Sequence, residues 1–117
     1  MKRNPETYLF DILEACNDIR EFVRDIHFED YSKSKITVAA VERKFSIIGE
    51  ALARLRERYP ELAEQISDIH QIVGFRNILI HGYHVVDSSV VWSAVVDKLP
   101  ILSREVQRLI DARTALI

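Results

Sequence analysis

Apolar residues recur every three or four positions along most of the chain, which is the spacing of one face of an α-helix. Asn4, Pro5 and Glu6 suit a helix start, because Asn can cap, proline fits the first turn and glutamate favours the positive end of the helix dipole. The apolar residues that follow at helical steps are Leu9, Ile12, Leu13, Cys16, Ile19, Val23 and Ile26. We therefore expect a first helix over residues 5 to about 27, followed by a polar linker over residues 29–33.

A second long helical pattern ends before Pro60, since the residue before a proline disfavours the helical conformation. Its apolar residues are Ile36, Ala39, Ala40, Phe45, Ile47, Ile48, Ala51, Leu52 and Leu55. Gly49 lies inside this pattern, where glycine costs up to about 1 kcal/mol relative to alanine. We therefore expect another backbone or side chain to pack closely against Gly49.

The second half of the chain predicts a short helical turn and two further helices. Pro60 should open a turn through Ile66, and Ser67 and Asp68 should cap a third helix that Gly82 ends. The apolar residues of the third helix are Ile69, Ile72, Val73, Phe75, Leu79 and Ile80. A strand through the valines at positions 85–86 and 90–91 is disfavoured, because capping residues interrupt the run.

The last helix should be capped by Asp87, Ser88 and Ser89 and kinked by Pro100. Its apolar residues are Val91, Trp92, Val95, Leu99, Leu102, Val106 and Leu109, of which we expect Trp92, Val95, Leu99 and Leu102 to lie in the core. Together these patterns predict an all-α fold: an antiparallel four- to five-helix bundle with a kinked last helix, forming one domain over residues 1–117.

Composition narrows the class of protein. With 48% hydrophobic and 29% charged residues, three glycines and three prolines, the chain resembles a folded, helix-rich domain. The lone Cys16 should be a buried thiol, which fits a reducing compartment, and neither a signal peptide nor a membrane span is recognisable. We therefore expect a cytoplasmic protein without a membrane association.

The net charge of −2 gives the molecule no overall positive field for holding nucleic acid, so any RNA contact must be local. Basic clusters occur at residues 43–44 and at positions 54, 56 and 58. Charges at such spacings are typical of a solvated helix face, and we expect them to form one here.

Candidate chemistry is concentrated near the end of the third helix, at Arg76, Asn77, His81 and Tyr83. Asn77 and His81 are four residues apart and share a helix face, so the amide can orient the imidazole. Arg76 and His81 are five apart, about 140° around a straight helix, so they converge poorly unless the helix end is distorted or a second subunit takes part.

An arginine and a histidine suffice for metal-independent RNA cleavage, in which the ribose 2′-hydroxyl attacks the neighbouring phosphate. Histidine moves protons near neutral pH, and a guanidinium stabilises the charge on the pentacoordinate phosphate. The same two residue types near a helix end also serve simply to satisfy its terminal carbonyls and its dipole. Spacing alone leaves both interpretations open.

The string from Arg76 to Tyr83 resembles the Arg-x4-His-x-Tyr signature of HEPN-domain toxins of the HepT type. Further similar stretches are Gly49-Glu50-Ala51, Val73-Gly74-Phe75, the segment from Val85-Val86-Asp87 to Trp92, and Leu99-Pro100. The resemblance therefore covers essentially the whole chain.

This resemblance implies a homodimeric ribonuclease that acts as the toxin of a type II toxin–antitoxin system, with its motifs at a cleft between subunits. Arg76 and His81 would be catalytic, and Asn77 would support them. Tyr83 would accept AMP from a partner antitoxin, a nucleotidyltransferase of the MNT type, which silences the toxin. Glu50 would be a partner for Arg76 or His81, although a surface or capping role is equally open. Neither a metal nor another cofactor is expected.

Three other interpretations remain. A metal site would use His81 and His84 with His70, Asp68 and Asp87, but Gly82 breaks the helix between the first two and no metal-binding spacing is present. A non-catalytic module would use Arg76 only to grip the phosphate of a nucleotide or to bind a partner protein. A helical interaction protein would use the last helix only to dimerise.

Overall fold

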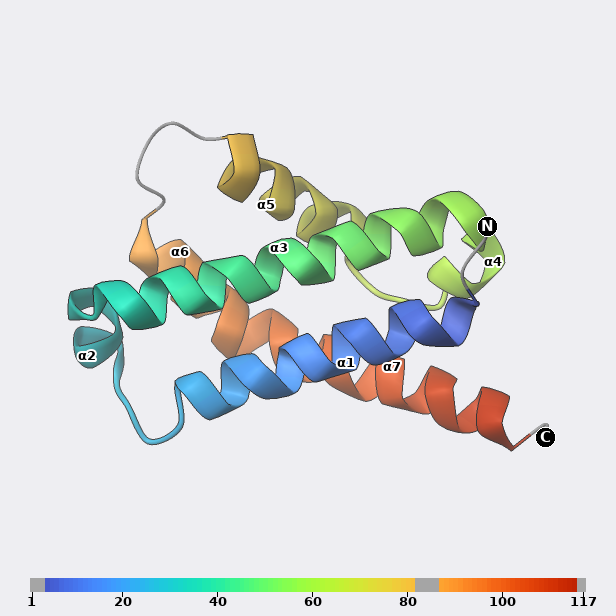
Figure 1. The fold of residues 1–117 in the computed structure, drawn as a ribbon, viewed down its shortest axis with the longest axis horizontal. Helices are drawn as coiled ribbons and strands as arrows, with labels where there is room; N and C mark the ends of the chain where they lie inside the picture. The colour runs from blue at the N-terminus through green and yellow to red at the C-terminus, as the bar shows by residue number, and fades with distance from the viewer. Residues whose placement is uncertain (1–3, 82–86, 116–117) are drawn as a thin grey trace.

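The computed structural model describes residues 4–81 and 87–115, and all the regular structure within these ranges is helical (Figure 1). The long helices are α1 (Pro5–Phe22), α3 (Lys35–Arg58), α5 (Ile69–His81) and α7 (Leu99–Thr114). The shorter segments are α2 (Phe28–Lys33), α4 (Pro60–Ala63), α6 (Ser88–Ser93) and the π-helical turn η1 (Ala94–Lys98). The predicted all-α fold is confirmed.

Helix α3 lies at the centre of the bundle. It packs against both α1 and α5, and α7 packs against α1. Successive long helices run in opposite directions, so the bundle is antiparallel (Figure 1). Within the described part of the chain, no helix combines the length and apolar character needed to cross a membrane.

The core is built from the apolar stripes that the periodicity predicts. Leu9, Ile12 and Ile19 of α1 are fully buried, and so is Cys16, where burial raises the pKa of the thiol to about 12. Cys16 is therefore a protonated core thiol at neutral pH, as its position in the stripe predicts. Ile36, Ala39 and Ile80 are exceptions, because all three side chains are exposed, that of Ile36 to 85% and that of Ile80 to 46%.

Helix α1 is shorter than its apolar pattern predicts. It ends at Phe22, and Asp25 adopts a φ of 59°, a left-handed conformation that stops an α-helix. Val23 and Ile26 still pack against the core, but they do so from the turn. The prediction of a helix to about residue 27 is wrong because apolar spacing persists beyond the point where the backbone leaves the helix.

The segment predicted as a polar linker contains helix α2. Its start is stabilised by a capping box, in which the backbone N–H of His27 donates to the carboxylate of Asp30 at 3.3 Å. Its fully buried Tyr31 lies against Trp92, with ring centroids 5.1 Å apart. A six-residue helix that buries one side chain has no periodic signature, so the sequence pattern missed it.

The last helical stretch is interrupted before Pro100, as the proline predicts. Proline has no N–H to donate and its ring crowds the carbonyl four residues earlier, and the wider π turn of η1 accommodates both effects. The regular helix α7 then begins at Leu99. The expected core position of Val95, Leu99 and Leu102 is confirmed, whereas Trp92 is only partly buried.

Candidate functional site

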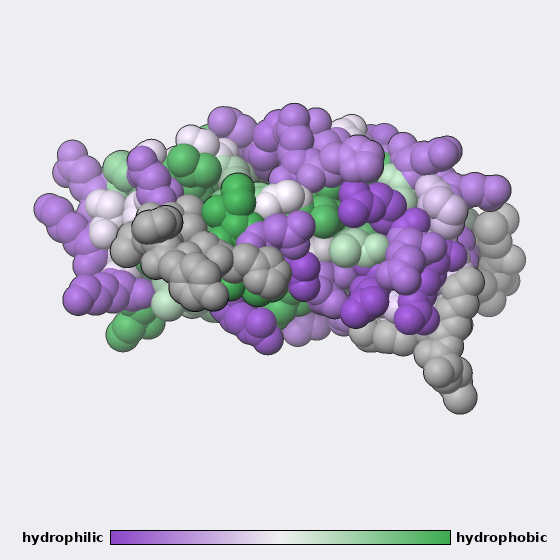
Figure 2. Space-filling model, turned by 90° about the horizontal axis from the view of Figure 1, so that it is seen from above, coloured by the Kyte–Doolittle hydropathy of each residue, from purple (hydrophilic) through white to green (hydrophobic). Residues whose placement is uncertain are grey.

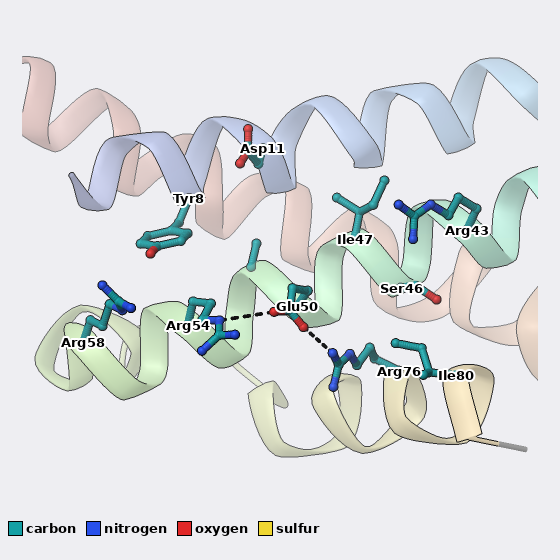
Figure 3. Close-up of a pocket in the computed structure, with 11 residues that line it drawn as sticks. Tyr8, Asp11, Arg43, Ser46, Ile47, Glu50, Arg54, Arg58, Arg76 and Ile80 are labelled. Atoms are coloured by element: carbon teal, nitrogen blue, oxygen red, sulfur yellow. Dashed lines mark hydrogen bonds and ion pairs between the residues drawn. The ribbon is translucent and has the colours of Figure 1, made fainter. Parts of the chain in front are cut away.

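A groove of about 640 Å³ lies between α1, α3 and α5 (Figure 3). Helix α3 forms its floor, because positions 43, 47, 50, 54 and 58 follow at steps of three and four and share one face. We call this surface the arginine groove, after the four arginines that line it: Arg43, Arg54, Arg58 and Arg76. Two carboxylates, those of Asp11 and Glu50, also line it. The groove is therefore locally basic in a chain whose net charge is negative.

Arg76 belongs to α5, and its side chain passes directly over Gly49 of α3 to reach this groove. A Cβ built on Gly49 would overlap the Cβ and Cγ atoms of Arg76, so any side chain here would force the two helices apart. The close contact predicted for Gly49 is therefore confirmed, and its partner is the stem of Arg76. Such a contact offsets the cost of glycine in the middle of a helix.

The guanidinium of Arg76 is held by two residues. Its Nη1 donates to Oδ1 of Asn77 at 2.9 Å, and its Nη2 donates to Oε2 of Glu50, with which it also forms an ion pair. Its Nε is buried without a hydrogen-bond partner. Since a guanidinium carries five N–H donors, two on the terminal nitrogens remain for a ligand in the groove.

Glu50 joins two of the arginines. Its second oxygen, Oε1, accepts a hydrogen bond from Nε of Arg54 at 3.2 Å, four residues along α3 (Figure 3). Arg54 also contacts Glu57 at 3.5 Å. Glu50 therefore contacts Arg76, as one of the sequence interpretations expects, and it orients two cations within the groove.

The start of α5 is fixed by contacts to the last helical stretch. Glu105 of α7 accepts hydrogen bonds from both the backbone N–H and the hydroxyl of Ser67, and Lys98 donates to Asp68 at 3.0 Å. Asp68 has a φ of 58°, and its backbone carbonyl accepts the N–H of Ile72. That bond is the first regular hydrogen bond of α5. The described contacts of the Ser67 and Asp68 side chains are to Glu105 and Lys98, so these side chains anchor the start of α5 to the last helical stretch rather than making the predicted cap.

The remaining motif residues lie at the edge of the described chain. His81 is the last residue of α5, and its side chain lies outside the description. Gly82, Tyr83 and His84 also lie outside the described residues. The expected pairing of Asn77 with the imidazole of His81 therefore stays a prediction. In the described contacts, the Asn77 amide oxygen accepts a hydrogen bond from Arg76.

The residues named for a metal site are engaged elsewhere where they are described. Nδ1 of His70 lies 2.8 Å from Nη1 of Arg56, and Asp68 is paired with Lys98. Across residues 4–80 and 87–115, no three His, Cys, Asp or Glu side chains come together as a metal site would require.

The sequence pattern missed the role of the basic residues on α3. Lys44 pairs with Asp18 and Arg56 lies against His70, as expected of a solvated face, but Arg43, Arg54 and Arg58 line the same groove as Arg76. Their common face was readable from their spacings of eleven and four residues, about three turns and one turn of a helix. The sequence pattern did not indicate that α5 would bring a fourth arginine, Arg76, to this face.

Known proteins resemble this chain over nearly its whole length. The profile of the family described as "Ribonuclease HepT-like" matches residues 12–109. A protein of Thermococcus cleftensis named "Probable ribonuclease HepT" is 38% identical over 109 residues, covering 93% of this chain and 98% of that protein. A Methanocaldococcus jannaschii protein with an RNase name is 36% identical over 110 residues, covering 91% and 96%.

A third relative, also with an RNase name, comes from Caldanaerobacter subterraneus subsp. tengcongensis and is 32% identical over 109 residues, covering 93% of this chain and 96% of that protein. No solved structure matches the chain. The arginine groove, with Arg76 fixed over Gly49, therefore lies in a protein that belongs to the family of HepT-like ribonucleases.

Proposed function

We propose that this protein is a metal-independent endoribonuclease in which Arg76 and His81 are the catalytic pair. The observation that carries the proposal is the fixed guanidinium of Arg76, which lines a basic groove and stands on the helix that ends at His81. If Arg76 only stabilised the fold, its function would not require free N–H donors facing a groove.

The reaction uses the substrate's own nucleophile. The 2′-hydroxyl attacks the adjacent phosphorus and loses its proton, the bond to the 5′-oxygen breaks, and that oxygen gains a proton. His81 moves one of these protons, and Arg76 stabilises the extra negative charge of the pentacoordinate phosphate with its free donors. Asn77 and Glu50 support the reaction by fixing the orientation of the guanidinium. The products are a 2′,3′-cyclic phosphate and a free 5′-hydroxyl.

The active form in this proposal is a homodimer. Arg76 and His81 diverge by about 140° on one helix, so a second copy of α5 supplies the complementary residue at a shared cleft. Ile78 and Ile80 lie within the motif with 58% and 46% of their surfaces exposed, and Figure 2 shows hydrophobic side chains among hydrophilic ones on the face that carries α5. Exposed apolar residues within the motif favour a subunit contact.

In the cell, we propose that the protein is the cytoplasmic toxin of a two-component system. Its partner is an MNT-type nucleotidyltransferase that transfers AMP from ATP to the hydroxyl of Tyr83 and releases pyrophosphate. The added phosphate is a bulky anion two residues from His81, so it blocks the cleft and repels the phosphates of RNA. The resemblance of the motif to HepT-type toxins supports this assignment.

Incubating the purified wild type and His81→Ala with end-labelled RNA in the presence of EDTA tests the catalytic proposal. We expect cleavage by the wild type alone, with cyclic phosphate ends, because neither proton transfer nor charge stabilisation requires a metal. Absence of cleavage by folded wild type that carries no AMP would contradict the proposal. It would favour a module that binds nucleotides or partners without catalysis.

Incubation with the cognate nucleotidyltransferase and ATP tests the modification. We expect the wild type to gain the mass of AMP and to lose its ribonuclease activity, whereas Tyr83→Phe should remain unlabelled and active. Intact-mass spectrometry followed by the cleavage assay measures both effects. Equal labelling of the two proteins would place the modification on another residue.

A further inference from the structure

Two arginines at opposite ends of the arginine groove carry charges that no described side chain neutralises in an ion pair. Arg54 is shared between Glu50 and Glu57, and Arg76 is paired with Glu50. Arg43 and Arg58, by contrast, form no ion pair within residues 4–80 and 87–115. Asp11 is the other carboxylate that lines the groove, and its single negative charge cannot neutralise both arginines.

These two arginines lie on either side of Arg76. Arg43 precedes Glu50 by seven residues on α3 and Arg58 follows it by eight, while Glu50 holds Arg76 between them (Figure 3). At 1.5 Å per residue, Arg43 and Arg58 are separated by about 22 Å along the helix. A line of this length spans several nucleotides of an extended strand and exceeds the reach of one phosphate group.

We propose that the face of α3 bearing Arg43, Arg54 and Arg58 is the track for the RNA strand, holding phosphates on both sides of the one that is cut. This inference rests on the proposed function, because it takes Arg76 as the group at the scissile phosphate. Arg43 and Arg58 bind flanking phosphates and position the strand, without taking part in the bond changes. Arg54, already oriented by Glu50, contributes to the central part of the track.

The ligand class follows from the chemistry of the lining. Guanidinium groups recognise phosphate oxygens, and contacts to phosphates position a strand without reading its bases. A single nucleotide carries its phosphates at one end and does not reach both Arg43 and Arg58. The groove therefore fits an oligonucleotide, and the track itself should impose little sequence preference.

Binding of a strand that cannot be cleaved tests the track separately from catalysis. We would measure fluorescence anisotropy of a labelled, fully 2′-O-methylated RNA 12-mer of mixed sequence with AMP-free protein, over a range of KCl concentrations. The variant is Arg43→Ala/Arg58→Ala, and the matched control is Arg104→Ala/Arg108→Ala, which removes two exposed arginines of α7 outside the groove.

We expect the groove variant to bind on the order of 10-fold more weakly at 0.1 M salt, with a salt slope lower by about 0.7 for each lost phosphate contact. The control should match the wild type, and Arg43→Lys/Arg58→Lys should recover most of the binding. An unchanged slope in the groove variant, or an equal loss in the control, would overturn the track even if the wild type cleaves RNA. A specific loss in a protein that never cleaves would retain the track and overturn only the catalytic proposal.

Discussion

Gly49→Ala is expected to lower the stability of the fold and to reduce RNA cleavage by on the order of 100-fold. The new methyl group would occupy the volume of the Arg76 stem, close to the α5 backbone, so a rotamer change cannot relieve the overlap. Overpacking of this kind costs about 1–3 kcal/mol. A shift of about 1 Å in a catalytic group is enough to cost roughly 100-fold in rate. Urea unfolding and single-turnover cleavage measure the two effects.

The matched control for this prediction is Gly74→Ala, the same substitution in the neighbouring helix. A Cβ at Gly74 meets nothing within 4 Å inside the protomer. Alanine should therefore stabilise α5 by up to about 1 kcal/mol, through its better helix propensity. Equal destabilisation by both substitutions would mean that the contact between Gly49 and Arg76 has no special role.

Arg76→Lys is expected to reduce the rate of RNA cleavage by about 100- to 1,000-fold, the usual loss when one group that stabilises a transition state is removed. Lysine keeps the charge, but its compact ammonium cannot bind Glu50 and Asn77 and still present two donors to a phosphate. In the wild type, the side chain of Arg76 is only 22% exposed, but that of its partner Glu50 is 43% exposed. The ion pair between them should therefore contribute less than about 1 kcal/mol to the stability of the fold.

Single-turnover rates for the wild type, Arg76→Lys and Arg76→Ala, together with their unfolding curves, test this prediction. Both variants should stay folded while losing activity. If Arg76→Lys cleaves at the wild-type rate, the residue acts only as a charge and its fixed geometry has no catalytic role. If both variants unfold, the ion pair with Glu50 is structural.

Much of the fold could be predicted from local patterns, because each long helix must bury an apolar stripe. Leu9 and Ile12 on α1 and Leu99 and Leu102 near the chain end all lie in the predicted core. The errors occur where the stripe is absent or misleading. Asp25 ends α1 early through its backbone conformation, and α2 forms around the single buried residue Tyr31.

The candidate site was predictable in part. The residues from Arg76 to Tyr83 stand out because polar groups crowd one end of an apolar helix, and their resemblance to a known motif agrees with the family matches. The arginines of α3 did not stand out. Their charges look the same in sequence whether they face open solvent or a groove beside another helix.

The sequence by itself determined the long helices, most of their apolar faces and the family, since these depend on residue spacing along one chain. It also marked Gly49 as a place of close contact, because glycine is costly inside a helix. Only the tertiary structure decided what makes that contact. The crossing of α5 over α3 places Arg76 on Gly49 and beside Glu50, 26 residues away, and brings it to the face of Arg43, Arg54 and Arg58. Contacts of this kind depend on how two helices cross, and the pattern along either helix does not contain that information.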